Sequence, residues 1–206
     1  GTMLGKDGKP FNTRQGGIKK LADLLDEAER RAAALVREKN PDVDPAQLKK
    51  LAKVIGLGAV KYSDLSKNRT SDYVFEWDQM LSVDGNTAPY LQSAYSRIQS
   101  VLRKSEADPT LLPRATVAED ESERRLAVCI AGFNDVLQQI VDEGYPHYLC
   151  AYLYDLATRF TTFYEQCPIL VSDNTQRTRR LSLANSAGIT LRKGLNLLGI
   201  DVVDQM

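Results

Sequence analysis

The chain has 206 residues, of which 43% are apolar and 26% are charged, and its formal net charge is zero. This length and composition allow one large domain, or one domain with part of another, around a real core, and they exclude large-scale disorder. The zero net charge gives no global argument for a nucleic-acid partner. Any RNA binding must therefore come from local patches of charge.

Cysteine and histidine usage limits the chemistry further. Three cysteines without C-x-x-C spacing and a single histidine, His147, argue against a disulfide framework and against a metal site. We expect buried, reduced cysteines in a cytoplasmic protein. No apolar run approaches the roughly 18 to 20 residues that a membrane span needs. The N-terminus lacks signal-peptide character, and Gly1 and Thr2 resemble a tag remnant ahead of Met3.

The first 17 residues are predicted to form a glycine- and lysine-rich loop region. The pair Asp7-Gly8, between the short runs 3–4 and 10–11, is typical of a β-hairpin. The segment FNTRQGG that follows, residues 11–17, predicts a polar and cationic loop. Glycines let a backbone approach a polyphosphate closely, and cations supply charge. The loop is therefore either a phosphate-binding loop or a plain surface loop.

Three helices are expected next, over residues 18–39, 44–56 and 57–65. Apolar residues at helical spacing define the first, and Asn40-Pro41 ends it. Gly56 is predicted to end the second helix and to separate it from the third. The run 73–77 is rich in β-branched and aromatic residues, which predicts a short strand. The single tryptophan, Trp77, is expected to anchor the core rather than to stack on a ligand.

A helix over residues 85–104 is the centre of the predicted fold. Asn86 and Thr87 are good capping residues, and Pro89 suits a first turn. Apolar residues at i, i+3/i+4 and i+7 spacing give it one core-facing side. The opposite side combines an aromatic ring, amides and fixed cations: Tyr90, Gln92, Ser93, Arg97, Arg103 and Lys104. That side is either a surface for folded RNA or a solvated helix face.

The remaining chain predicts a linker and three more helices. Residues 105–120 read as the linker, and helices are expected over 119–144, over 146–168, and from Asp173 or Thr175 to Leu198. The Tyr/Phe stripe of the middle helix is expected in the core. Five cations and no acid lie between residues 176 and 193, namely Arg177, Arg179, Arg180, Arg192 and Lys193. This patch either contacts phosphates or solvates the helix.

Several long blocks of the chain resemble arginyl-tRNA synthetases. They are GLGAVKYSDLSKNRTSDYVFEWDQMLSVDGNTAPYLQSAYSRIQSVLRK from residue 56 to residue 104, MLGKDGKPFNTRQGG near the start and LRKGLNLLGIDVVDQM at the finish. The resemblance covers nearly the whole chain. It implies a mainly α fold: a helical bundle, the class I synthetase anticodon-binding domain named for its D-A-L-R motif, preceded by a small, mostly helical remnant of the catalytic domain with a short β-hairpin. The D-A-L-R motif itself is replaced by YDLATRF.

The resemblance divides the chain into three parts and implies a role for each. Residues 1–17 are the counterpart of the K-M-S-K loop, which contacts ATP phosphates, with Lys9, Thr13 and Arg14 as the implied contacts. Residues 18–85 are the end of the catalytic domain with connecting helices. Residues 86–206 are the bundle that binds tRNA-Arg. The implied tRNA contacts, joined by cations from the basic patch, are Tyr90, Arg97, Arg180, Arg192, Lys193 and Met206.

The same resemblance implies limits on activity. The chain lacks the H-I-G-H motif of a class I synthetase and its Rossmann core, so we expect no catalysis by this chain alone. The whole protein would be an arginine–tRNA ligase that uses ATP and Mg²⁺, with no cofactor bound to this part. Its partners would be tRNA-Arg and the missing N-terminal and Rossmann domains, in a monomeric, cytoplasmic protein without membrane contact.

Two other interpretations stay open at this point. The chain is alternatively a stand-alone RNA-binding paralogue that begins at Met3, or a helical protein-interaction module without an RNA role. The resemblance to arginyl-tRNA synthetases implies that Tyr90 and Met206 line a pocket for an anticodon-loop base, although Ser93 stands where relatives often show a second tyrosine. Strong salt dependence of tRNA affinity would favour an RNA function over the interaction module.

Overall fold

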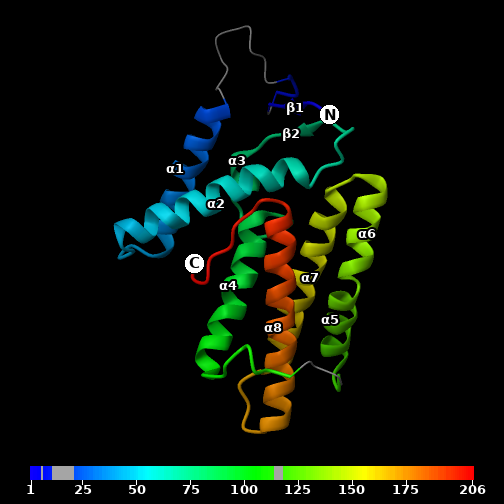
Figure 1. Cartoon of the computed structure of the whole chain (residues 1–206). Coiled ribbons are helices and arrows are strands. Elements are labelled where there is room, and N and C mark those ends of the chain that lie inside the picture. Colours follow the sequence, from blue (N-terminus) through cyan, green and yellow to red (C-terminus); the bar gives the residue numbers. More distant parts are fainter. Residues whose placement is uncertain (6, 11–20, 114–117) are drawn as a thin grey trace.

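The computed structural model describes residues 1–5, 7–10, 21–113 and 118–206. Their arrangement is shown in Figure 1. In chain order the elements are β1 (Met3–Leu4), α1 (Leu21–Lys39), α2 (Pro45–Leu65), β2 (Tyr73–Val74), α3 (Trp77–Met80), α4 (Ala88–Ser105), α5 (Glu121–Ala131), α6 (Phe133–Glu143), α7 (His147–Gln166) and α8 (Asn174–Leu197).

The described residues form a helical bundle with a smaller helical layer across one end. Helices α4, α7 and α8 pack on one another, and α5 and α6 cover α7 on the outside (Figure 1). Helix α2 lies across the end of the bundle against α4, and α1 packs along α2. The main apolar core lies inside the bundle, and two smaller clusters lie under α1, α2 and α3. The expected mainly α architecture is confirmed.

The β structure differs from the predicted hairpin. Strand β1 pairs in parallel with β2, with Met3 opposite Tyr73 and Leu4 opposite Val74. Among the described residues on either side of the turn, an antiparallel bridge joins Leu4 to Pro10 across Gly8, whose φ is +70°. The turn is therefore confirmed. The two-residue ladder of β1 is thus formed with β2, about 70 residues away along the chain.

Helix α2 runs unbroken from Pro45 to Leu65, so the predicted division at Gly56 is wrong. Gly56 is buried where α1 crosses α2. A Cβ atom added to Gly56 would lie 2.7 Å from the carbonyl carbon of Ala28 in α1. Glycine thus allows the two backbones to approach one another and does not end the helix. Sequence spacing cannot distinguish these two roles, because the reason lies on another helix.

The predicted single helix over 119–144 is divided into α5 and α6 at Gly132. The Gly132 N–H donates to the carbonyl oxygens of Val128 and Cys129 at 3.2 Å and 3.1 Å. Its ψ of −1° departs from the helical value and ends α5. The predicted end at Gly144 is confirmed, since this glycine closes α6 with a φ of +72°.

The predicted helix starts are confirmed where a side chain caps them. Thr87 Oγ1 accepts the N–H of Tyr90 at 3.2 Å, and Asp173 Oδ1 accepts the N–H of Gln176 at 2.8 Å. The apolar stripe of α7 also lies in the core, with Phe160 and Phe163 fully buried. Local capping chemistry and helical periodicity therefore sufficed to place most of the bundle.

Replacing Gly56 with alanine tests the close approach of α1 and α2. The added methyl group meets the Ala28 backbone, which cannot move aside as a side chain would. We expect Gly56→Ala to lower the free energy of unfolding by about 1–3 kcal/mol, the range for overpacked sites. Urea denaturation followed by circular dichroism measures this loss.

Gly132→Ala is the matched control for that substitution. A Cβ atom added there has its nearest neighbour at 3.5 Å, and the φ of −73° suits any residue. We expect unchanged stability or a gain of about 0.4–1 kcal/mol, because alanine restricts the unfolded chain. An equal loss in both variants would contradict the close-approach explanation.

Candidate nucleic-acid interface

A groove of about 970 Å³ lies between α1, α2, α3, one side of α4 and the last residues of the chain. Its main apolar side chains are those of Leu35, Leu51, Ile55, Trp77, Leu81 and Met206. Its charged side chains are those of Arg30, Arg31, Lys39, Arg103, Glu38 and Asp78. Four cations thus face two carboxylates around an apolar floor. This combination suits an anionic ligand that carries flat, apolar rings.

Trp77 and Arg31 form one wall of the groove. The Arg31 guanidinium lies 5.0 Å from the centroid of the Trp77 ring, and the ring meets Phe75 edge-on at 4.9 Å. Trp77 packs against both small apolar clusters, which confirms the predicted core role. It also lines the groove, which the prediction did not include.

Glu27 holds two of the groove's cations in place. Its Oε1 accepts hydrogen bonds from Arg30 Nη2 and Arg31 Nε, both at 2.7 Å. The hydrogen bonds from Arg30 and Arg31 lower the pKa of Glu27 to about 2, so the carboxylate stays ionised at neutral pH. This pairing fixes the direction of Arg31 over Trp77 and reduces the positive charge on that side. Lys39 and Arg103 lie elsewhere along the groove.

The residues of the predicted polar face of α4 do not form one continuous surface in the structure. Tyr90 is half-buried, with its ring 5.6 Å from that of Tyr154 on α7. Arg97 is exposed, and its guanidinium lies 5.5 Å from the ring of Tyr164. Neither Tyr90 nor Arg97 lines the groove that Met206 lines. The structure therefore does not bring Tyr90 and Met206 into one pocket, because Tyr90 packs against α7 whereas Met206 lines the groove.

Gln92 was expected on the exposed face and is fully buried. Its Nε2 donates to the carbonyl oxygens of Val54 on α2 and Asp201 in the C-terminal segment, at 3.3 Å and 2.9 Å. The helix is covered on this side by α2 and by the end of the chain, so an amide at this position meets backbone instead of water. The single-helix pattern carries no sign of that cover.

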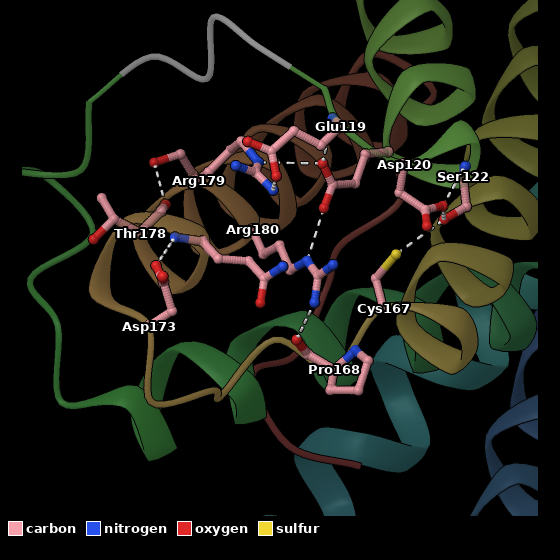
Figure 2. A network of polar contacts seen from close by, with 12 residues as sticks. Glu119, Asp120, Ser122, Cys167, Pro168, Asp173, Thr178, Arg179 and Arg180 are labelled. Carbon is pink, nitrogen blue, oxygen red and sulfur yellow. Dashed lines mark hydrogen bonds and ion pairs between the residues drawn. The ribbon is translucent and has the colours of Figure 1, made fainter.

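The cations at the start of α8 are used inside the protein, as Figure 2 shows. Arg180 donates to Glu123 Oε1 at 2.7 Å and to the carbonyl oxygen of Pro168 at 2.8 Å. Arg179 donates to Glu123 Oε2 at 3.2 Å and to Glu119 Oε2 at 2.8 Å. Only 8% of Arg180 is exposed, so its assignment to an RNA surface is corrected to an internal role. The continuous basic patch is not formed.

Two of the five cations in the predicted patch remain on the surface. Arg192 and Lys193 are exposed near the end of α8, about five helical turns from the start of the helix. Arg177 is half-buried and donates to the carbonyl oxygen of Ser105 at 2.7 Å. The charges were visible in the sequence, but their partners come from α5 and from the end of α4.

The buried carboxylate of Glu123 is kept ionised by its neighbours. Burial raises its pKa, but hydrogen bonds from Arg180, from the backbone N–H of Glu119 and from Arg179 outweigh burial and hold the pKa below its usual value. The same cluster continues to Cys167, whose Sγ lies 3.2 Å from Ser122 Oγ. Burial raises the pKa of the Cys167 thiol, which is consistent with a structural role.

Of the three residues predicted to contact ATP phosphates, the structure describes one. Lys9 is exposed in the turn around Gly8, and its backbone N–H donates to Asp7 Oδ1 at 3.2 Å. Thr13 and Arg14 lie outside the described residues. One exposed ammonium group next to a glycine turn is compatible with a phosphate ligand. The other two implied contacts stay predictions.

The structure also bears on the predicted state of the cysteines, on metal binding and on membrane spans. All three cysteines, Cys129, Cys150 and Cys167, are free, as predicted. Within residues 1–5, 7–10, 21–113 and 118–206, no group of three or more His, Cys, Asp or Glu side chains could hold a metal ion. In the same described part of the chain, no helix is long and apolar enough to cross a membrane.

Sequence reasoning missed most of the groove. Arg31 and Lys39 were not assigned to any binding site, and Trp77 was expected in the core alone. The groove is formed by α1, α4 and the C-terminal residues together, so no single periodic pattern marks it. Of the groove residues, Met206, Arg103 and Ser93 had been named as candidates for RNA contact in advance.

Comparison with known proteins identifies relatives along the whole chain. The family described as "DALR anticodon binding domain" matches residues 91–206, and that described as "tRNA synthetases class I (R), catalytic domain" matches residues 1–77. Arginine–tRNA ligases align with 100% of this chain: those of Proteus mirabilis at 52% identity, Chromobacterium violaceum at 56% and Escherichia coli O1:K1 at 55%. The chain spans 36% of the length of each of these relatives.

Solved structures agree with the sequence comparison. The arginyl-tRNA synthetase of Thermus thermophilus is similar with a TM-score of 0.88 and 32% identity, over 100% of this chain and 34% of that one. The arginyl-tRNA synthetase of Plasmodium falciparum is similar with a TM-score of 0.83 and 32% identity, over 92% of this chain and 34% of that one. These likenesses confirm the expected fold.

The Glu123 cluster predicts a defined response to acid. The pKa of the Glu123 carboxyl in the folded state is lower than its ordinary value of 4.5. The ionised carboxylate therefore contributes its full stabilisation of the fold above pH 4.5, and this contribution is lost as the pH falls through the folded-state pKa. We expect Glu123→Gln to lower the free energy of unfolding at pH 7 by roughly 3 kcal/mol, because Arg179 and Arg180 lose their buried partner. Below about pH 4 the difference from the parent chain should shrink. Urea denaturation at several pH values measures both effects.

Glu121→Gln is the control on the same helix. Glu121 also pairs with two arginines, Arg124 and Arg125, but all three side chains are more than half exposed. An exposed pair of this kind contributes at most about 1 kcal/mol. Similar losses for Glu121→Gln and Glu123→Gln would contradict the assignment of the buried cluster as a structural anchor.

Proposed function

The chain belongs to the DALR anticodon-binding family, and from this we propose that its bundle and the groove beside α4 bind the anticodon arm of tRNA-Arg. The observation that supports this most directly is the groove itself, where cations surround an apolar floor containing Trp77 and Met206. Proteins read single-stranded RNA loops by stacking unpaired bases on such side chains and by holding phosphates with Lys and Arg. The groove's volume exceeds what one nucleotide needs, so it is suited to more than one residue of a loop.

Several residues outside the groove would extend the contact along the RNA. Arg97 is exposed beside Tyr164, and Tyr90 lies about two helical turns earlier on α4, against Tyr154 of α7. We assign Arg97, Arg192 and Lys193 to phosphate contacts, because their charges reach the surface. Tyr90 is assigned to a contact through the exposed edge of its ring. Arg180 is no longer included.

For the longer protein we propose an arginine–tRNA ligase that uses ATP and Mg²⁺. The support is the alignment of the whole chain with arginine–tRNA ligases, of which it spans 36%. Lys9, Thr13 and Arg14 would contact the ATP phosphates, and Mg²⁺ is assigned to no residue of this chain. Amino-acid activation would require the Rossmann domain, which, with the N-terminal domain, would be a partner of this part. We propose a monomeric, cytoplasmic enzyme.

Titration with RNA tests the proposed function. We expect this chain to bind tRNA-Arg more tightly than an anticodon-substituted tRNA-Arg, and both affinities to fall as salt rises. Each phosphate contact contributes roughly 0.7 to 0.9 to the slope of log affinity against log salt. Fluorescence anisotropy at two salt concentrations measures the slopes. Equal affinity for both RNAs with a steep slope would favour a general RNA-binding paralogue, and absence of binding would favour a protein-interaction module.

Single substitutions separate phosphate contacts from base contacts. Arg97→Gln and Lys193→Gln should each weaken binding to both RNAs equally and reduce the salt slope by roughly 0.7 to 0.9. Met206→Ala should instead reduce the preference for the native anticodon, by roughly fivefold if one apolar base contact of about 1 kcal/mol is lost. Arg125→Gln, an exposed arginine on α5, is the control and should change neither quantity.

A further inference from the structure

The last seven residues return along α4 after α8 ends. Gly199, with a φ of +68°, ends α8, and the Ile200 N–H donates to the carbonyl oxygen of Leu195 at 2.9 Å. The segment then passes α2 and runs beside α4 from the beginning of that helix toward its end, and the C-terminus lies beside α4 (Figure 1). Ile200 and Val203 are buried and anchor it, whereas Met206 is 48% exposed at the groove.

Four side chains of α4 hydrogen-bond this segment: Tyr95 OH donates to the Asp204 side chain at 3.3 Å, and the other three donate to backbone carbonyl oxygens. Gln92 Nε2 donates to the carbonyl oxygen of Asp201 at 2.9 Å, Ser96 Oγ donates to that of Val203 at 2.7 Å, and Arg103 Nη1 donates to that of Asp204 at 3.1 Å. We call these three residues the α4 clamp. They are spaced by four and by seven positions, so they form one stripe along the helix.

The α4 clamp sets the register of the C-terminal segment. All three of its acceptors are backbone carbonyl oxygens, so the hydrogen bonds depend on where the backbone lies and not on which side chains it carries. The order of donors along α4 matches the order of acceptors along the segment. A shift by one residue would break this match. The position of Gln205 and Met206 at the groove therefore follows from the clamp.

Two donors of the α4 clamp are buried, so losing their carbonyl acceptors would destabilise the fold. Gln92 is fully buried and Ser96 is 8% exposed, and a buried donor without an acceptor is costly. Gly58 leaves room for the Gln92 amide, since a Cβ atom added there would lie 2.9 Å from Gln92 Nε2. The same amide nitrogen also donates to Val54 on α2. Gln92 thus connects α2, α4 and the C-terminal segment at one point.

We propose that Gln92, Ser96 and Arg103 are positioning residues that fix the C-terminal segment in one register and thereby place Met206 in the groove. The structural part of this proposal depends only on the hydrogen bonds above. Its consequence for RNA recognition rests on the proposed function.

The methionine methyl groups give a direct test that needs no RNA. The chain has three methionines, Met3, Met80 and Met206, so ¹³C-methyl spectra of labelled protein are simple to assign. We expect Ser96→Ala to shift and narrow the Met206 signal toward that of a free chain end while the Met80 signal stays in place. An unchanged Met206 signal would overturn the proposal.

Ser105→Ala is the matched control on the same helix. Ser105 is also a buried serine whose Oγ donates to a carbonyl oxygen at 2.7 Å, but that oxygen belongs to Leu102 within α4. The Ser105→Ala substitution should leave the Met206 methyl signal in place even if it lowers the free energy of unfolding. Should Ser96→Ala prove too unstable, Arg103→Gln carries the same measurement, because Arg103 is exposed and its loss leaves no buried gap.

RNA binding tests the functional part through a double-mutant cycle. Ser96→Ala and Met206→Ala are each expected to reduce the preference for the native anticodon by roughly fivefold, the value of about 1 kcal/mol. The double variant should lose no more of the preference for the native anticodon than the stronger single variant does, because both substitutions abolish the same contact of Met206 with the RNA. Additive losses would show that Ser96 does not act through Met206. If the parent chain shows no preference, the proposed function fails, and the methyl spectra still decide the clamp.

Discussion

Burial of α4 on several sides is the constraint on which the rest of the structure depends. One side of this helix packs into the bundle against α7 and α8, and another meets α2 and the C-terminal segment. Its buried positions include polar side chains such as Gln92 and Ser96, whose partners come from outside the bundle. The smaller helical layer, the bundle and the end of the chain are thereby joined around a single element, and each contributes to the groove.

The charges of the protein serve two separate purposes. Arg179 and Arg180 are drawn inward by Glu123, and this cluster ties the start of α5 and the segment after α7 to α8 (Figure 2). Lys39 and Arg103 instead line the groove. A chain with zero net charge can therefore present a local positive surface, because many of its acids are consumed in internal or helix-surface pairs.

The sequence predicted the elements better than the contacts between them. Caps at Thr87 and Asp173 and the apolar stripes of α4, α7 and α8 depend on neighbouring residues, so local rules were enough. Gly56 was misjudged because its role is set by the α1 backbone, and Gln92 because α2 and the C-terminal segment cover it. Arg180 looked like part of a basic patch until its partner on α5 was known. The groove could not be predicted, since its walls come from segments more than 100 residues apart.

The hydrogen bond between Ser96 and Val203 joins residues that are 107 positions apart. Closing so long a loop carries a large entropic penalty unless the helices in between have already packed and shortened the effective distance. We therefore expect the bundle to fold first and the C-terminal segment to dock last. Removal of the segment from Ile200 onward would therefore be expected to leave a folded bundle that lacks one wall of the groove.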